Sequence, residues 1–233
     1  MGKRIALIAA IFAGIILALY IIARVTGALQ VFKIPAPVNE PAIKAGKRVL
    51  SSNLVSFKRF DFICFYYTDP MVGKEQTYMY RLVGMPGDSL QIKEGDLYIN
   101  GKIADAHLDL NLEYTIPKEH FQAIADLVGP QNEELPYYYI FDTAVLAVLH
   151  KEQLTKLDEL HIPYRRQIYT ATQPDQQIEA IYHMPWNIDN FGPIVIPKDK
   201  YFVMGDNRHR AQDSRYIGLV AKESICGTIL GNH

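Results

Sequence analysis

The sequence predicts a mostly β protein with one N-terminal transmembrane helix and an inserted α+β subdomain. Three observations indicate this fold class: an uncharged apolar run at residues 5–23, strand-like runs separated by turn sequences on both sides of residues 104–184, and helical spacing of apolar residues between them. They divide the chain into a short N-terminus at residues 1–4, an anchor at 5–23, a β core formed by 24–103 and 185–233, and an insert at 104–184.

The anchor is the run IALIAAIFAGIILALYIIA. Its roughly 19 residues, at about 1.5 Å rise each, nearly span the roughly 30 Å of hydrocarbon in a bilayer. The alternative is a cleavable signal peptide, which has a shorter apolar region and a small-x-small site that the following RVTGALQVFKIP does not supply. We therefore expect a retained, single-pass anchor. Lys3 and Arg4 precede the run and Arg24 and Lys33 follow it, so the slight charge bias favours a cytoplasmic N-terminus and an exported body.

The composition indicates a folded protein. Of the 233 residues, 49% are hydrophobic and 21% are charged, as in globular proteins. A formal net charge of −1 and the lack of a basic stripe give no indication of a nucleic-acid partner. Cys64 and Cys226 lie in apolar strand-like runs, where they fit either two buried thiols or one disulfide.

The core is predicted to consist of strands and turns. Pro35, Pro37 and Pro41 exclude a helix ahead of a strand at residues 48–52. FDFICFYYT and TYMYRLVGM have strand composition, and KEGD and Asn100-Gly101 are turns that join short strands into hairpins. GPIVIPKDKYFVMGDNR, YIGLVA and SICGTIL predict a return to β structure after the insert.

The predicted insert at residues 104–184 differs from the core because parts of it have helical spacing. PKEHFQAIADLV and FDTAVLAVLHKEQLTKLDEL have apolar residues at helical spacing, so we expect helices there. Its histidines stand singly, without an i, i+4 pair and a partner acid, so the sequence predicts neither a metal site nor a cofactor. They are His107, His120, His150, His161 and His183.

Four blocks in order behind the anchor resemble the type I signal peptidase family. They are IPAPVNEPAIKAGKRVL, YRLVGMPGDSLQIKEGDLYINGK, WNIDNFGPIVIPKDKYFVMGDNR and DSRYIGLV. The insert resembles the family's variable second domain. The resemblance implies an antiparallel β-sheet core and a serine endopeptidase of the bacterial-type inner (plasma) membrane, which uses a Ser–Lys pair to remove signal peptides from exported proteins.

That chemistry needs a serine nucleophile and a neutral, desolvated lysine as its base. The family pattern IPSGSMEPTL, laid on IPAPVNEPAI, places the nucleophile at Val38, the serine of the oxyanion hole at Ala36 and the following methionine at Asn39. The base position, directly before the arginine of the next block, is Tyr80, and a neutral phenol is a weak base.

The loop GDNRHRAQDSR departs from the family at one further position. The serine that helps to hold the lysine falls on Ala211. The residues that brace the active site in the family all match, and they are Gly205, Asp206, Asn207, Arg208, Asp213, Ser214 and Arg215.

The four substitutions predict a catalytically impaired or inactive family member, because a nucleophile and its base act as a unit. We expect it to bind the membrane and either signal peptides of exported proteins or an active paralogue. One alternative is an active signal peptidase with a relocated pair; the other is a structural membrane module without a groove. The candidates for a relocated pair are Ser51, Ser52, Ser56 and Ser89 with Lys44, Lys47 and Lys58.

Overall fold

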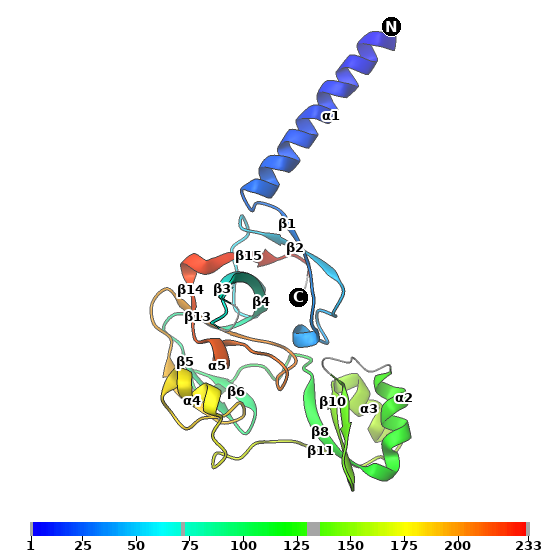
Figure 1. Ribbon diagram of the computed structural model, residues 1–233, viewed down its shortest axis with the longest axis vertical. Helices are drawn as coiled ribbons and strands as arrows, with labels where there is room; N and C mark the ends of the chain where they lie inside the picture. Colours follow the sequence, from blue (N-terminus) through cyan, green and yellow to red (C-terminus); the bar gives the residue numbers. More distant parts are fainter. Residues whose placement is uncertain (1, 71–72, 130–135, 232–233) are drawn as a thin grey trace.

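The structure is a computed structural model that describes residues 2–70, 73–129 and 136–231. Helix α1 (Gly2–Val25) stands clear of a body made mostly of β-sheet (Figure 1). No side chain of α1 that the structure describes is buried, and by length and composition it is the one helix in the described ranges able to cross a membrane. The predicted fold class, mostly antiparallel β with an N-terminal apolar helix, is confirmed.

The largest sheet has seven strands, which come from both the N-terminal and the C-terminal parts of the chain. Its order is β1 (Gln30–Lys33), β2 (Arg48–Ser52), β15 (Ile225–Ile229), β3 (Phe62–Thr68), β4 (Glu75–Gly84), β13 (Lys200–Met204) and β14 (Val220–Ala221). Strand β4 pairs with β3 from Glu75 to Arg81, but its pairing with β13 begins only at Arg81. The first half of β4 therefore has a strand neighbour on one side only.

A second sheet of four strands packs beside the first. Its order is β12 (Phe191–Val195), β5 (Ser89–Lys93), β6 (Asp96–Ile99) and β7 (Lys102–Ile103). The predicted hairpin turn between β6 and β7 is confirmed, with Asn100 and Gly101 at φ of 52° and 77°. Both left-handed values are what a two-residue hairpin turn requires, which is why Asn-Gly predicts it well.

The third sheet lies in the insert, at the end of the molecule away from α1 (Figure 1). Its order is β11 (Arg165–Arg166), β8 (Leu112–Pro117), β10 (Ala144–Leu149) and β9 (Tyr138–Ile140). It shares a core with α2 (Phe121–Val128) and α3 (Lys151–Glu159), through buried residues such as Ile116, Ile124 and Leu157. Helix α4 (Gln176–Tyr182) packs elsewhere, because Ile178 lies in one cluster with Phe191 and Phe202 of the core.

Three predictions of secondary structure were wrong in part. The prolines ahead of β2 were expected to exclude a helix, but Pro37–Asn39 forms a 3₁₀ helix, η1, because proline is tolerated in the first turn. Residues 144–149 form strand β10 instead of helix, and only the second half of that run, α3, is helical. The six apolar residues AVLAVL pair with β8, and an apolar run this short does not distinguish a buried strand from a helix. In YIGLVA the chain begins as a short helix, α5 (Ser214–Ile217), because the Asp213 carboxylate accepts a hydrogen bond from the Arg215 N–H at its N-terminus.

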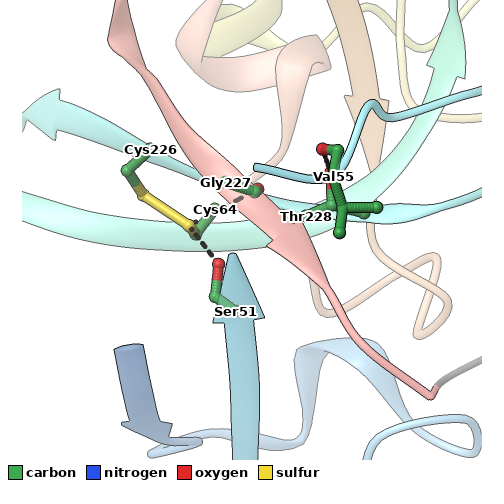
Figure 2. Close-up of a disulfide and its surroundings, with 6 residues drawn as sticks. All are labelled: Ser51, Val55, Cys64, Cys226, Gly227 and Thr228. Carbon is green, nitrogen blue, oxygen red and sulfur yellow. Dashed lines mark hydrogen bonds between the residues drawn. A yellow bond between two sulfur atoms is a disulfide. The ribbon is translucent and has the colours of Figure 1, made fainter. Parts of the chain in front are cut away.

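The two cysteines form a disulfide that joins β3 to β15. Cys64 and Cys226 are 162 residues apart in sequence and their Cα atoms are 5.4 Å apart. Figure 2 shows the bridge beside Ser51, whose hydroxyl is 3.2 Å from the Cys64 sulfur. The structure thus decides between the two cysteine states that the sequence left open.

Candidate functional site

Three segments far apart in sequence meet at Gly205, at the end of β13. The Asn207 N–H donates to the Val38 carbonyl oxygen at 3.1 Å, and the Asn207 amide donates to the Pro37 carbonyl oxygen at 3.1 Å. A Cβ at position 205 would clash with Ala211 and with the Val38 oxygen, 2.5 Å away, and would lie 3.4 Å from the Tyr80 ring. Glycine is required here because the backbones approach so closely. The structure therefore brings together three of the substituted positions, Val38, Tyr80 and Ala211.

The three side chains at these positions meet in an apolar environment. Tyr80 and Ala211 belong to one buried cluster, at 5% and 3% exposure, and Val38 packs against it half-buried. The other buried members of this cluster are Ile63, Phe65, Leu82, Tyr201, Val203 and Val220.

The Tyr80 hydroxyl keeps its proton here. Burial raises the pKa of Tyr80, the Asp213 carboxylate raises it further, and Arg215 and the Gln212 backbone N–H oppose these effects. The Tyr80 side chain is enclosed by the surrounding cluster. A neutral phenol in this position is a hydrogen-bond donor and a poor proton acceptor.

A groove of about 230 Å³ opens beside Val38, between the segment after β1 and the open edge of the first half of β4. Ala36, the fourth substituted position, lines this groove as a half-buried residue. The remaining lining residues are mostly apolar, and they are Phe32, Lys33, Ile34, Pro35, Val38, Asn39, Gln76, Thr77, Tyr78, Met79 and Tyr80.

Behind the groove, buried ion pairs hold the loop after β13. Arg81 donates to both carboxylate oxygens of Asp206, at 2.7 and 2.6 Å. Arg208 donates to Asp105 at 2.6 Å and to the Gly205 carbonyl oxygen at 3.2 Å. All four charged side chains are almost fully buried. The bonds tie the loop to β4 and to the start of the insert.

A second group of bonds closes the same loop from its C-terminal end. Both oxygens of Asp213 accept from Arg215, each at 2.8 Å, and one of them also accepts from the Gly205 N–H at 3.0 Å. Arg215 donates further to the Arg208 carbonyl oxygen at 2.6 Å, and the Ser214 hydroxyl accepts from the Val203 N–H at 2.9 Å. All seven family-matched loop residues are therefore buried and joined to their surroundings.

The candidates for a relocated Ser–Lys pair do not meet. The Ser51 hydroxyl contacts the Cys64 sulfur, and the Ser52 hydroxyl donates to the Ala28 carbonyl oxygen at 2.7 Å. Every lysine of the chain lies in the described ranges, where Lys200 is half-buried and the others are exposed. Because none of these lysines is buried, none has the desolvated amine that a general base requires.

Two features of the site were missed at the level of sequence. Asn39 is 1% exposed, lines the groove, and donates to the Met79 carbonyl oxygen at 2.8 Å. Next to it, Glu40 accepts a bond from the Tyr137 hydroxyl at 3.1 Å, which ties the Val38 segment to the insert. Burial and the Glu40 carboxylate raise the pKa of Tyr137 to about 12. Asn39 stood out only as a polar residue at a position where the family has methionine.

Comparisons with known proteins place the chain in a family. The family model described as "Signal peptidase, peptidase S26" matches residues 4–231. The signal peptidase I of Bacillus amyloliquefaciens is 29% identical over 158 residues, which cover 67% of this chain and 50% of that protein. That of Buchnera aphidicola subsp. Schizaphis graminum is 31% identical over 161 residues, covering 64% and 46%.

The matched part of the chain spans about half the length of these two relatives. A crystal structure of a signal peptidase I from Enterococcus faecalis V583 aligns with 75% of this chain and 97% of that chain, at 21% identity and a TM-score of 0.35. The family model covers almost the whole sequence, and the chain therefore belongs to the signal peptidase family S26.

Proposed function

We propose that this family member is anchored in the membrane by α1 and binds extended, signal-peptide-like segments of exported proteins without cleaving them. The observation that carries the proposal is the pair of side chains at the reaction centre, an isopropyl group at Val38 and a buried phenol at Tyr80. Neither supplies a nucleophile or a base, and catalysis collapses when both are lost.

Binding is supported by the open edge of β4. The Met79 carbonyl accepts from Asn39, so it points away from β3 and toward the groove. Backbone groups in a strand alternate in direction, so the N–H and C=O of Thr77 point the same way. No strand of the described ranges pairs with this edge before Arg81. An extended peptide that adds as a strand would find unused backbone partners there.

The disulfide supports an exported body. Structural disulfides persist in oxidising compartments and are rare in the bacterial cytosol. A cytoplasmic N-terminus before α1, with the Cys64–Cys226 bridge on the other side of the membrane, satisfies both the disulfide and the charge bias around the helix. The division into anchor, two-part core and insert at residues 104–184 belongs to the same proposal.

The test of catalysis uses the full chain in detergent with a purified preprotein. We expect no product after prolonged incubation, whereas an active signal peptidase in the same detergent cleaves the preprotein. Cleavage at the small-x-small boundary by the purified chain would refute the inactive assignment.

The test of binding uses a fluorescent signal-peptide segment and two N-methylated versions of it. One version carries methyl groups on the odd-numbered backbone amides and the other on the even-numbered amides. Because only one set of amides faces β4 in an added strand, only one version is expected to lose binding. If the unmodified segment does not bind at high micromolar concentration, the chain is a structural membrane module.

A further inference from the structure

The groove contains a buried amide with a hydrogen-bond acceptor left unused. Asn39 is 1% exposed, and its Nδ2 donates to the Met79 carbonyl oxygen at 2.8 Å. Its Oδ1 is buried and accepts no hydrogen bond from any group in the described part of the chain. A buried carbonyl oxygen without a partner is uncommon in a folded protein.

The Asn39 amide imitates one peptide group of an added strand. Its N–H occupies the Met79 oxygen, which the backbone N–H of a bound peptide would otherwise take. Its own C=O has no partner in the described part of the chain, so it remains available as an acceptor in the groove. A ligand that lies along Thr77 and continues past Met79 therefore meets the Asn39 oxygen where it would have met the backbone oxygen.

Resting on the binding function proposed above, we propose that Asn39 is a peptide-recognition residue. Its Oδ1 accepts one backbone N–H of the bound segment and so extends the hydrogen-bonding edge of β4 by one side-chain amide. Since a neutral hydrogen bond of ordinary strength changes an equilibrium about fivefold, a segment with no N–H at that position, such as one with proline there, binds about fivefold more weakly. Asn39 thereby sets where proline is disfavoured in the ligand.

The neighbouring groups define the environment of this bond. Val38 precedes Asn39, its carbonyl oxygen is already held by the Asn207 N–H, and Tyr80 follows Met79. A side chain of similar size without an amide, such as leucine or the methionine of the family pattern, still separates the ligand from the Met79 oxygen but offers no acceptor. The ligand N–H at this position then has no partner, while the strand-like mode of binding stays the same.

The experiment is a cycle between one protein variant and a set of ligands. Segments that each carry a single N-methylated amide are titrated against the wild-type chain and against Asn39→Leu, which keeps the side-chain size and removes both polar atoms. We expect one methylated position to weaken wild-type binding about fivefold, and methylation of that same amide to leave binding to the variant unchanged, because the leucine fills the space of the amide and offers no acceptor.

A matched control and a folding check keep the result interpretable. Lys102→Met changes an exposed residue of β7 outside the groove and should leave the methylation profile as in the wild type. Thermal unfolding of each variant verifies that the groove is intact, and Asn39→Met provides a second replacement if Asn39→Leu does not fold. If the segments bind but Asn39 variants and wild type give the same profile, this inference is wrong and the proposed function stands. If no segment binds even to the wild type, both fall together.

Discussion

The reaction centre can be tested by rebuilding it. The change is Val38→Ser with Tyr80→Lys and Ala211→Ser, which places a hydroxyl, an amine and a supporting hydroxyl on three segments that already meet around Gly205. We expect the triple variant to cleave a preprotein detectably. The double variant without Ala211→Ser should be inactive, because nothing then holds the amine in register.

The size of the accompanying effect on stability follows from the burial of Tyr80, which is 5% exposed in an apolar cluster. An amine placed there should lose about three pKa units from its ordinary value of about 10.4. Each unit corresponds to about 1.36 kcal/mol, so the variant should be about 4 kcal/mol less stable near pH 7 than a variant without the charge. The nearby Asp213 carboxylate would reduce this penalty, although Arg215 already pairs with it.

The stability of the Tyr80→Lys variant should rise with pH. A folded amine with a depressed pKa is neutral while the unfolded chain still binds the proton, so stability rises with pH from the folded pKa up to about 10 and is lowest below the folded pKa. Urea unfolding of Tyr80→Lys from pH 6.5 to 10 should show this rise. Tyr80→Leu, which also removes the phenol but adds no charge, should not show it.

Two results from the cleavage assay and the unfolding series would contradict these expectations. A triple variant that is folded, has the expected pH dependence and still cleaves nothing would show that the scaffold no longer aligns the two groups. Wild-type cleavage equal to that of the triple variant would show that the chemistry never depended on positions 38 and 80.

Three further predictions concern stability and are measured by urea unfolding of the full chain in detergent. Asp206→Ala leaves the Arg81 charge buried without its partner, so the free energy of unfolding should fall by about 3–5 kcal/mol. Cys226→Ser opens a disulfide that spans 162 residues and should cost up to about 5 kcal/mol, so reductant should weaken the wild type and leave the variant unchanged. Burial raises the pKa of Asp88, but hydrogen bonds, among them one from Arg59, lower that pKa overall. The charged Asp88 therefore stabilises the fold above about pH 4, and this contribution to the free energy of unfolding is lost as the pH falls. The Asp88→Asn variant should not show this loss.

Most of the core could be predicted because its signals are local. The Asn100-Gly101 turn requires left-handed backbone at both positions, and few residue pairs other than Asn-Gly tolerate it, so the sequence alone predicts this turn. The strand at residues 48–52 follows from the prolines ahead of it, and the structure has β2 at Arg48–Ser52. These inferences need no knowledge of what the segments pack against.

Features decided by long-range contacts could not be predicted. The run AVLAVL becomes β10 because β8 and β9 flank it, and nothing within the run distinguishes that outcome from a helix. The disulfide depends on β15 returning between β2 and β3, an arrangement that no spacing of two cysteines reveals. The unpartnered oxygen of Asn39 depends on the position of Met79, forty residues away.

The buried ion pairs explain how the loop keeps its shape independently of the side chains at positions 38 and 80. None of Arg81, Asp206, Arg208, Asp213 and Arg215 lines the groove, and each is paired behind it. A buried charge whose partner is lost destabilises the fold strongly, whatever happens in the groove in front. The loop that holds Val38 through Asn207 therefore keeps its conformation because the fold needs these ion pairs. The hydroxyl and the amine of a Ser–Lys pair contribute to the reaction instead. They can be exchanged for apolar side chains without unfolding the chain. This separation is the reason that rebuilding the pair is a fair test of the scaffold.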